Sequence, residues 1–239
     1  GGNILSEGTA HFSTIMLIRE KLGEQARIET MKRFEEQYGR DRVADSERPL
    51  VKVDGTRNGD TAVTYDKGGW VFTMLQDLMG RDQNLAGIQQ FFRVYAKNAD
   101  HPVLQDFVAT LRPYAPDPVA FDAFVKQWFF EVVMPEYKLS DVKKEKASDG
   151  NGWVVTATVT NVGTGTMPLD VAAALQDRFT KQSDDEAAKG PAPVSADYKE
   201  SRRSITLQAG ANAVVTIDCD FEPDRVVIAS VRWNKTPFD

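Results

Sequence analysis

The spacing of apolar residues changes class once along this chain of 239 residues, near residue 140. From about residue 7 to residue 115, apolar residues recur three and four positions apart, as on one face of an α-helix. From Trp153 onward they alternate or form short β-branched runs bounded by turn residues. The sequence therefore predicts an α+β multidomain protein. An N-terminal all-α helical domain (1–138, about six helices) is followed by an all-β domain (139–239), an immunoglobulin-like sandwich.

Turn-forming residues and apolar stripes divide the helical part. Helix ends are expected at Gly23, Gly39, Gly80, around Pro102 and over 113–118. One core stripe is formed by Val71, Met74, Leu75 and Leu78, which stand at i, i+3, i+4 and i+7. The clearest helix begins with Asp117 as N-cap and Pro118 at the first helical position, where a missing N–H is not needed.

Less regular segments separate these helices and the strands. The polar stretch 40–64 is interpreted as a surface excursion with one extended piece, 50–53. Strands are predicted over 153–160, 169–175, 201–207, 213–217 and 225–233. The segment 181–196 is rich in Ser, Asp, Ala, Pro and Lys, so it is expected to form a mobile loop without chemistry.

Charge and composition exclude several classes of partner. The formal net charge is -6, which leaves no broad basic face and argues against nucleic acid. No run of about 18 apolar residues is present, so this piece is expected to be soluble. It begins Gly1-Gly2-Asn3, without an initiator Met or signal peptide, and we expect this to be a cut edge. A single cysteine, Cys219, cannot form an internal disulfide, so the compartment stays unknown.

Candidate ligands and nucleophiles are few. The chain has two histidines, His11 and His101, and no H-E-x-x-H, so it cannot form a histidine-rich zinc site by itself. Glu7 and His11 lie four residues apart on one helical face, where they could be two metal ligands; alternatively, His11 packs as a partly buried ring. Cys219 lies in the segment 216–220, which continues the strand predicted at 213–217; it is far in sequence from either histidine and is expected to be a core residue. No nucleophile elbow, P-loop or dinucleotide fingerprint is present.

Two motifs carry a family resemblance. The segment Leu-Ser-Glu-Gly-Thr-Ala at 5–10, followed by a long helix, resembles the segment that supplies the third zinc ligand in the aminopeptidase N family of zinc metallopeptidases, the gluzincins. Tyr-Asp-Lys-Gly at 65–68 resembles that family's Tyr-Glu-Lys-Gly motif. The order of the two motifs along the chain matches the layout of the family over about 5–137. So does the position of Trp128 and Met134-Pro135 just before a β domain. The Leu-Ser-Glu-Gly motif around Glu7 is most similar to that of family members whose peptidase domain is fused behind a transporter-like membrane segment.

The resemblance implies a site whose other half lies outside the chain. Glu7 would be the third zinc ligand in the intact parent, and Tyr65 would be the catalytic donor to the oxyanion. The H-E-x-x-H helix of such enzymes should precede Glu7 by roughly twenty residues, which makes the upstream part of the same polypeptide the necessary partner. Zinc is expected in the intact parent and no cofactor in this fragment. Any membrane contact would come through segments outside it, as in a bacterial-type, membrane-anchored protein.

Three points qualify that implication. Ser6 and Asp66 stand where many family members have Asn and Glu. A Glu at a helix start often interacts with the helix dipole, and a Tyr before a helix often packs.

The resemblance predicts that the parent hydrolyses N-terminal residues of peptides while the fragment is inactive. The alternative is a non-catalytic, peptidase-like binding module of a membrane-associated protein. If the resemblance holds, Glu7 and Tyr65 should face one concave surface although 58 positions separate them.

Overall fold

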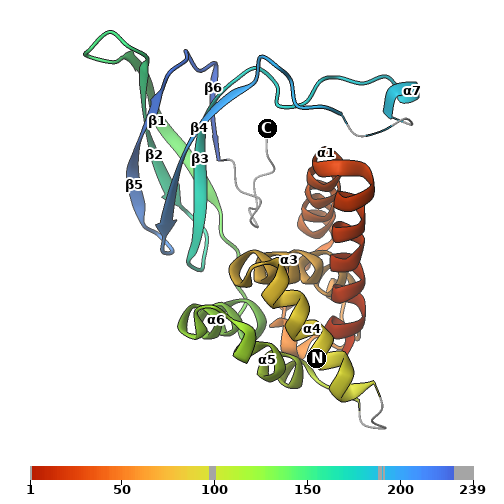
Figure 1. The fold of residues 1–239 in the computed structure, drawn as a ribbon. Helices are drawn as coiled ribbons and strands as arrows, with labels where there is room; N and C mark the ends of the chain where they lie inside the picture. Colours follow the sequence, from red (N-terminus) through yellow and green to blue (C-terminus); the bar gives the residue numbers. More distant parts are fainter. Residues whose placement is uncertain (1, 97–100, 188–189, 191, 229–239) are drawn as a thin grey trace. The chain divides into compact units, whose positions relative to one another are not determined.

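The computed structural model describes residues 2–96, 101–187, 190 and 192–228. The protein is mixed α+β, and a helical part precedes the strands, as the sequence predicts (Figure 1). Contacts between residues divide the chain into two compact units. The helical unit comprises Gly1–Leu17 and Arg33–Val133, and the strand unit comprises Ile18–Lys32 and Met134–Asp239. The change from helix to strand occurs between Phe130 and Tyr137, while residues 18–32 group with the strands, which the sequence did not indicate.

The helices follow one another with short connections. A π-helical turn, η1 (Ile4–Gly8), leads into α1 (Thr9–Asp41), which Gly23 interrupts with φ 86°. The short elements η2 (Ala44–Ser46) and η3 (Leu50–Lys52) precede a continuous run of α2 (Asp60–Ala62), the π turn η4 (Val63–Lys67) and α3 (Gly68–Met79). The remaining helices are α4 (Arg81–Tyr95), α5 (Leu104–Leu111), η5 (Arg112–Tyr114), α6 (Pro118–Val125) and the π turn η6 (Lys126–Phe130).

Two helix boundaries confirm the local signals. The Asp117 carboxylate accepts hydrogen bonds from the backbone N–H groups of Val119 (2.9 Å) and Ala120 (3.0 Å), and Pro118 occupies the first turn. Gly80 separates α3 from α4 with φ 82°, a left-handed conformation that glycine adopts without strain. These caps were predictable because both depend on a few adjacent residues.

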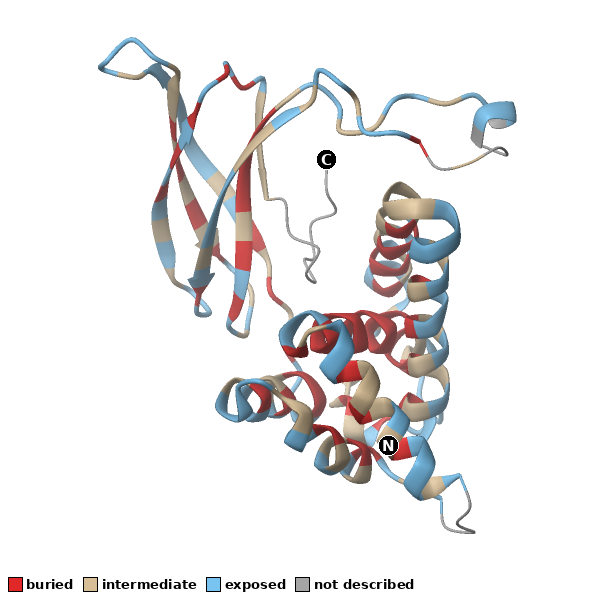
Figure 2. Ribbon diagram, viewed as in Figure 1, coloured by how far each residue is buried: buried red, intermediate tan, exposed pale blue. Residues whose placement is uncertain are grey.

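Helix α3 is the centre of the helical unit. It is buried along nearly its whole length (Figure 2), and Val71, Met74 and Leu75 all lie in the core as predicted. Leu78 of the same predicted stripe is instead 39% exposed, because α3 ends one residue later at Met79. Phenylalanines surround the helix: Phe72 lies 5.5 Å from Phe107 and 5.7 Å from Phe129 between ring centroids. The core is therefore aromatic and closely packed around α3.

The stretch 40–64 is more than a surface excursion. Leu50 and Val53 are each 1% exposed, and the piece 50–53, predicted to be extended, forms a 3₁₀ turn in which Lys52 N–H donates to Pro49 C=O at 2.8 Å. Arg48 pairs with both Asp54 and Asp60. The polar composition suggested solvent, but ion pairs within the segment satisfy these groups and allow two apolar anchors to reach the core.

The strand unit contains two three-stranded antiparallel sheets. Strands β1 (Tyr137–Lys146), β2 (Trp153–Asn161) and β5 (Asn212–Cys219) form one in the order β1-β2-β5. Strands β4 (Lys199–Leu207), β3 (Met167–Leu175) and β6 (Arg225–Ile228) form the other in the order β4-β3-β6. Four predicted strands are confirmed at nearly their full extent. The fifth is confirmed over 225–228, and its predicted continuation, 229–233, lies outside the described residues.

Strand β1 was not predicted. Its sequence, Tyr-Lys-Leu-Ser-Asp-Val-Lys-Lys-Glu-Lys, is dominated by charged residues, and its burial falls away after the first positions. It pairs with β2 on one side only, with an irregularity between Ser140 and Lys143 where Asp141 takes φ 51°. Charges and bulges are typical of edge strands, where they discourage pairing with other chains. Because of the same features, a prediction based on alternating apolar residues misses this edge strand.

The segment 181–196 is not wholly irregular. It contains the short helix α7 (Asp184–Ala187), and Val194 forms an isolated antiparallel bridge with Phe179.

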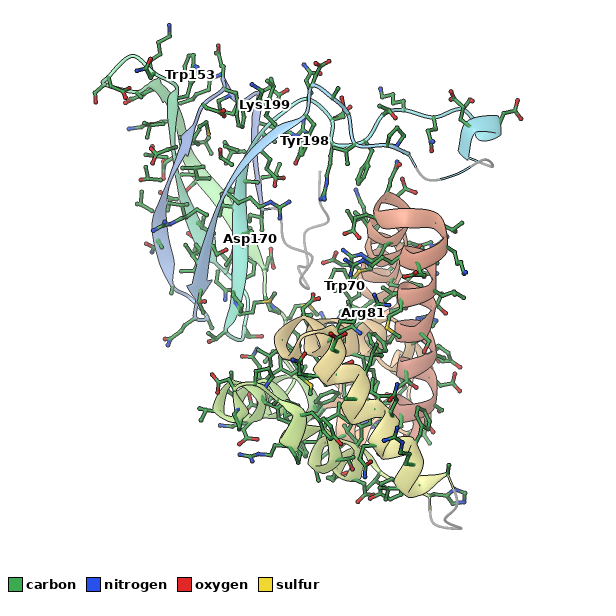
Figure 3. The ribbon with its side chains drawn as sticks, viewed as in Figure 1. Trp70, Arg81, Trp153, Asp170, Tyr198 and Lys199 are labelled. Carbon is green, nitrogen blue, oxygen red and sulfur yellow. The ribbon has the colours of Figure 1, made fainter. Side chains whose placement is uncertain are left out.

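On the β3–β4 ladder, Asp170 (labelled in Figure 3) accepts a hydrogen bond from the Ser204 hydroxyl and lies 3.6 Å from Arg202.

A search of the described helices for a membrane span finds none that combines sufficient length with sufficient hydrophobicity.

Candidate functional site

The two motifs lie in π-helical turns that contact each other. Glu7 belongs to η1 and Tyr65 to η4, and these turns pack together at glycines. A Cβ added to Gly68 would clash with Ile4 Cδ1 and would lie 3.2 Å from Gly8 Cα. The absence of side chains at these glycines thus allows η1 to approach the start of α3 closely. Isolated π turns within α-helices occur frequently at functional sites.

Glu7 and Tyr65 meet across this contact. The Tyr65 hydroxyl donates a hydrogen bond to the Glu7 carboxylate, and this bond, followed by burial and by the carboxylate's charge, raises the pKa of Tyr65 above its ordinary value. Both side chains are partly exposed. The structure therefore brings together the two residues that the sequence singled out. A phenol that keeps its proton near a carboxylate remains a hydrogen-bond donor at neutral and moderately alkaline pH.

His11 lies beside this pair, one turn along the helix from Glu7. Its ring stacks on Phe34, with centroids 4.3 Å apart and planes 15° apart, and meets the Tyr65 ring edge-on at 5.1 Å. Burial lowers the pKa of His11, although a hydrogen bond to the Tyr65 backbone and the charge of Glu7 act in the opposite direction. The imidazole is therefore predominantly neutral at pH 7. This is the packed, partly buried ring that was the alternative to a metal ligand.

Asp66 is a buried carboxyl on the same turn. Its Oδ1 lies 3.8 Å from His11 Nδ1, beyond hydrogen-bonding distance. Burial, with a smaller contribution from the nearby Asp41 carboxylate, raises the pKa of Asp66 to about 7, although Arg40 acts to lower it. Asp66 therefore titrates near neutral pH instead of being a permanent negative charge.

Lys67 has a structural partner set of its own. Its side chain is 2% exposed, and its Nζ donates to Glu47 Oε1 at 2.7 Å and to Val133 C=O at 3.2 Å. Glu47 also accepts hydrogen bonds from the Tyr38 hydroxyl and the Arg42 guanidinium. Burial lowers the pKa of Lys67. Burial acts to raise the pKa of Glu47, but the charge and hydrogen bond of Lys67 and the other donors hold it below its usual range. Lys67 thus attaches the 42–59 segment to the helices.

The described residues do not form a metal site by themselves. Across the ranges that the structure describes, no group of three or more His, Cys, Asp or Glu side chains could hold a metal ion. The other candidates lie elsewhere: His101 is exposed before α5, and Cys219 is buried in β5, where burial raises the pKa of its thiol. Glu7, with two carboxylate oxygens and one phenol donor, can supply a single metal ligand and orient a hydroxyl next to it.

Several neighbours of the site were not found by sequence reasoning. Phe34 supports the His11 ring and lies more than twenty residues from it in the sequence. Glu47 neutralises Lys67 and lies about twenty residues before it. Neither belongs to a motif or stands at a helical spacing from its partner. No local signal marks such contacts.

No known protein-family model and no curated protein matches this chain. What the site can do is therefore decided by its own geometry.

Proposed function

We propose that the helical unit is one part of the active site of a zinc-dependent aminopeptidase, in which Glu7 is the third zinc ligand and Tyr65 is the donor to the oxyanion. One observation carries this proposal: the side chains of two residues 58 positions apart interact where two π turns pack together beside Gly8 and Gly68. An ordinary packing role for Tyr65 would not need a carboxylate partner, and a dipole role for Glu7 would not need a phenol.

The chemistry divides between the metal and the residues of this chain. Zinc, when bound, activates a water molecule and polarises the peptide carbonyl. One Glu7 carboxylate oxygen would bind the metal while the other accepts the Tyr65 hydrogen bond. Because the phenol has one proton, its O–H would rotate about the C–O bond from Glu7 toward the position where negative charge develops on the substrate, and a donor there lowers the barrier. The raised pKa of Tyr65 keeps that proton on the phenol.

The proposal requires ligands from outside the described residues. Two histidines of an H-E-x-x-H helix in the upstream part of the same polypeptide would complete the zinc site, and the substrate would be a peptide with a free N-terminus. Without them the chain would be inactive. The alternative function is a non-catalytic, peptidase-like binding module, and the presence or absence of an H-E-x-x-H helix in the full-length protein discriminates between the two.

We further propose that the strand unit is an immunoglobulin-like sandwich. Its strand orders, β1-β2-β5 and β4-β3-β6, match the pairing A-B-E and C′-C-F of that fold when the strands are lettered in chain order. Alternate residues of β2 and β5 are buried, and β4 contacts β5 while β1 contacts β6. A seventh strand that pairs with β6 would complete the second sheet.

The function is tested on the full-length protein, including any residues before Gly1. Zinc content and the rate of cleavage of aminoacyl substrates are measured for wild type, Glu7→Gln and Tyr65→Phe. We expect Glu7→Gln to lose stoichiometric zinc. Tyr65→Phe should keep zinc and lose about 10²- to 10³-fold in kcat, the usual effect of removing one oxyanion donor.

Matched controls are available elsewhere in the helical unit. Glu36→Gln changes an exposed carboxylate of α1, and Tyr114→Phe removes a phenol from η5, so both should retain zinc and activity. If Glu7→Gln leaves both zinc content and peptidase rate unchanged, the peptidase proposal is wrong. A full-length protein without H-E-x-x-H, zinc or activity would favour the binding module.

A further inference from the structure

The position of the Tyr65 phenol is not explained by its hydrogen bond alone. Tyr65 is partly exposed and its hydroxyl has the Glu7 carboxylate as partner. A single hydrogen bond at a surface is too weak by itself to restrict an aromatic side chain to one rotamer. Another contact must hold the ring if the phenol is to act as a fixed donor.

The ring of His11 supplies that contact. It meets the Tyr65 ring edge-on, with centroids 5.1 Å apart. The same imidazole stacks on the buried ring of Phe34 at 4.3 Å. The imidazole of His11 therefore contacts both the buried Phe34 ring and the Tyr65 ring.

The backbone of His11 is held equally closely. A Cβ added to Gly69 would lie 2.7 Å from His11 Cβ, so the backbones of α1 and α3 are close together where the His11 side chain leaves α1. This close approach fixes the position of the His11 Cβ, and the stacking on Phe34 fixes the orientation of the ring.

We propose that His11 is a positioning residue for Tyr65: its ring, supported by Phe34, holds the phenol against Glu7. This inference rests on the proposed function for its catalytic consequence, but its structural content concerns the 239-residue chain alone. His11 does not itself touch the reacting atoms.

The structural test uses nuclear magnetic resonance on the 239-residue chain with labelled tyrosine. Signals of Tyr65 are assigned from Tyr65→Phe, and its χ1 rotamer is measured from three-bond couplings. We expect one χ1 rotamer and ring-to-ring Overhauser contacts with His11 in the wild type. His11→Ala should give averaged couplings, His11→Phe should restore one rotamer through the ring, and His101→Ala should change nothing.

The catalytic test uses the full-length protein. His11→Ala should lower kcat about tenfold with KM within twofold and zinc content unchanged, because misplacing a donor affects the transition state more than binding. His11→Phe should recover most of that loss. All three variants keep a Cβ against Gly69, and thermal melts verify folding. If His11→Ala does not fold, His11→Phe against His11→Gln, which keeps a donor without the ring, provides the same comparison.

The outcomes separate the two proposals. A single, unchanged Tyr65 rotamer in His11→Ala, or in His11→Gln if that comparison is used, overturns the positioning role. An unchanged kcat in an active, zinc-containing full-length protein does the same. If the full-length protein neither binds zinc nor cleaves peptides, the peptidase proposal fails, while the couplings still decide whether His11 positions Tyr65.

Discussion

The helical unit and the strands at 134–228 differ in what they bury. The helical unit contains buried ionisable side chains, among them Asp60, Asp66 and Lys67. It also contains three π turns and several close contacts at glycines. In the described strand region, residues 134–228, the interior consists of Val, Ala, Leu, Ile and Met with a few other apolar residues, and Asn161 is the buried polar residue there. The strands pair in register over most of their length.

This difference indicates where function should be sought. Buried charges and irregular backbone cost stability, and they persist only where the surrounding structure enforces them. Perturbed pKa values concentrate at functional sites, although structural ion pairs also produce them. The helical unit carries both kinds of feature: Lys67 is explained by Glu47, whereas Asp66 and Tyr65 have shifted pKa values beside the Glu7 contact.

The largest expected effect comes from breaking the buried ion pair of the helical unit. Glu47→Ala leaves the Lys67 ammonium without its carboxylate, so we expect a loss of about 3–5 kcal/mol in the free energy of unfolding, measured by urea denaturation. As a control, Lys126→Ala removes an exposed pair with Glu131 and should cost under about 1 kcal/mol. The double replacement Glu47→Leu with Lys67→Met should recover much of the loss. If it does not, the pair contributes more than mutual neutralisation.

The next effect depends on pH. Asp66 binds its proton more tightly in the folded protein, where its pKa is about 7, than in the unfolded chain, where it is 3.8. Its contribution to stability is therefore fully present below about pH 4 and is lost as pH rises to about 7. Asp66→Asn should be more stable than wild type by roughly 2–4 kcal/mol at pH 8, and the difference should largely vanish near pH 4.

Thermal or urea unfolding at both pH values measures this difference. The exposed Asp45→Asn is the matched control and should stay within about 0.5 kcal/mol of wild type at either pH. A difference between Asp66→Asn and wild type that is the same at pH 4 and pH 8 would contradict the assigned titration.

The strand unit should be most sensitive at its buried amide. Asn161 Nδ2 donates to Gly165 C=O at 3.1 Å, and its Oδ1 accepts from Gly163 N–H at 3.1 Å. Asn161→Ala leaves both groups unpaired, so we expect a loss of about 2–3 kcal/mol and faster amide exchange in β2 and β3. The exposed Asn212→Ala should cost under about 0.5 kcal/mol. Equal effects of the two variants would show that the amide is not a structural anchor.

The smallest pair of effects compares two helical glycines. Gly68→Ala places a Cβ against Ile4 and should destabilise the protein by about 1–3 kcal/mol while separating Glu7 from Tyr65. Gly39→Ala has open space around it in an exposed helical turn and should stabilise by about 0.5–1 kcal/mol. Melting temperatures check the signs. Opposite signs support the crossing at Gly68, and a neutral Gly68→Ala would refute it.

Much of the fold was predictable, and the reasons are local. The helix that begins at Asp117 and the turn at Gly80 follow from adjacent residues, and β2 to β5 follow from alternation. Strand β1 was missed because its charges obscure its pattern, and the piece 50–53 was misread because its anchoring depends on ion pairs. For the site, Glu7 and Tyr65 were identified from motifs, whereas Phe34 was not.

The sequence by itself determined the change from helix to strand, the helix caps and the two residues on which the proposed site depends, because each is encoded within a few neighbouring positions. Only the tertiary structure decided that Glu7 and Tyr65 meet, that Lys67 is neutralised by Glu47, and that Asp66 titrates near pH 7. These properties arise from burial and from contacts between residues far apart in the chain, where desolvation and the choice of neighbour set the energies.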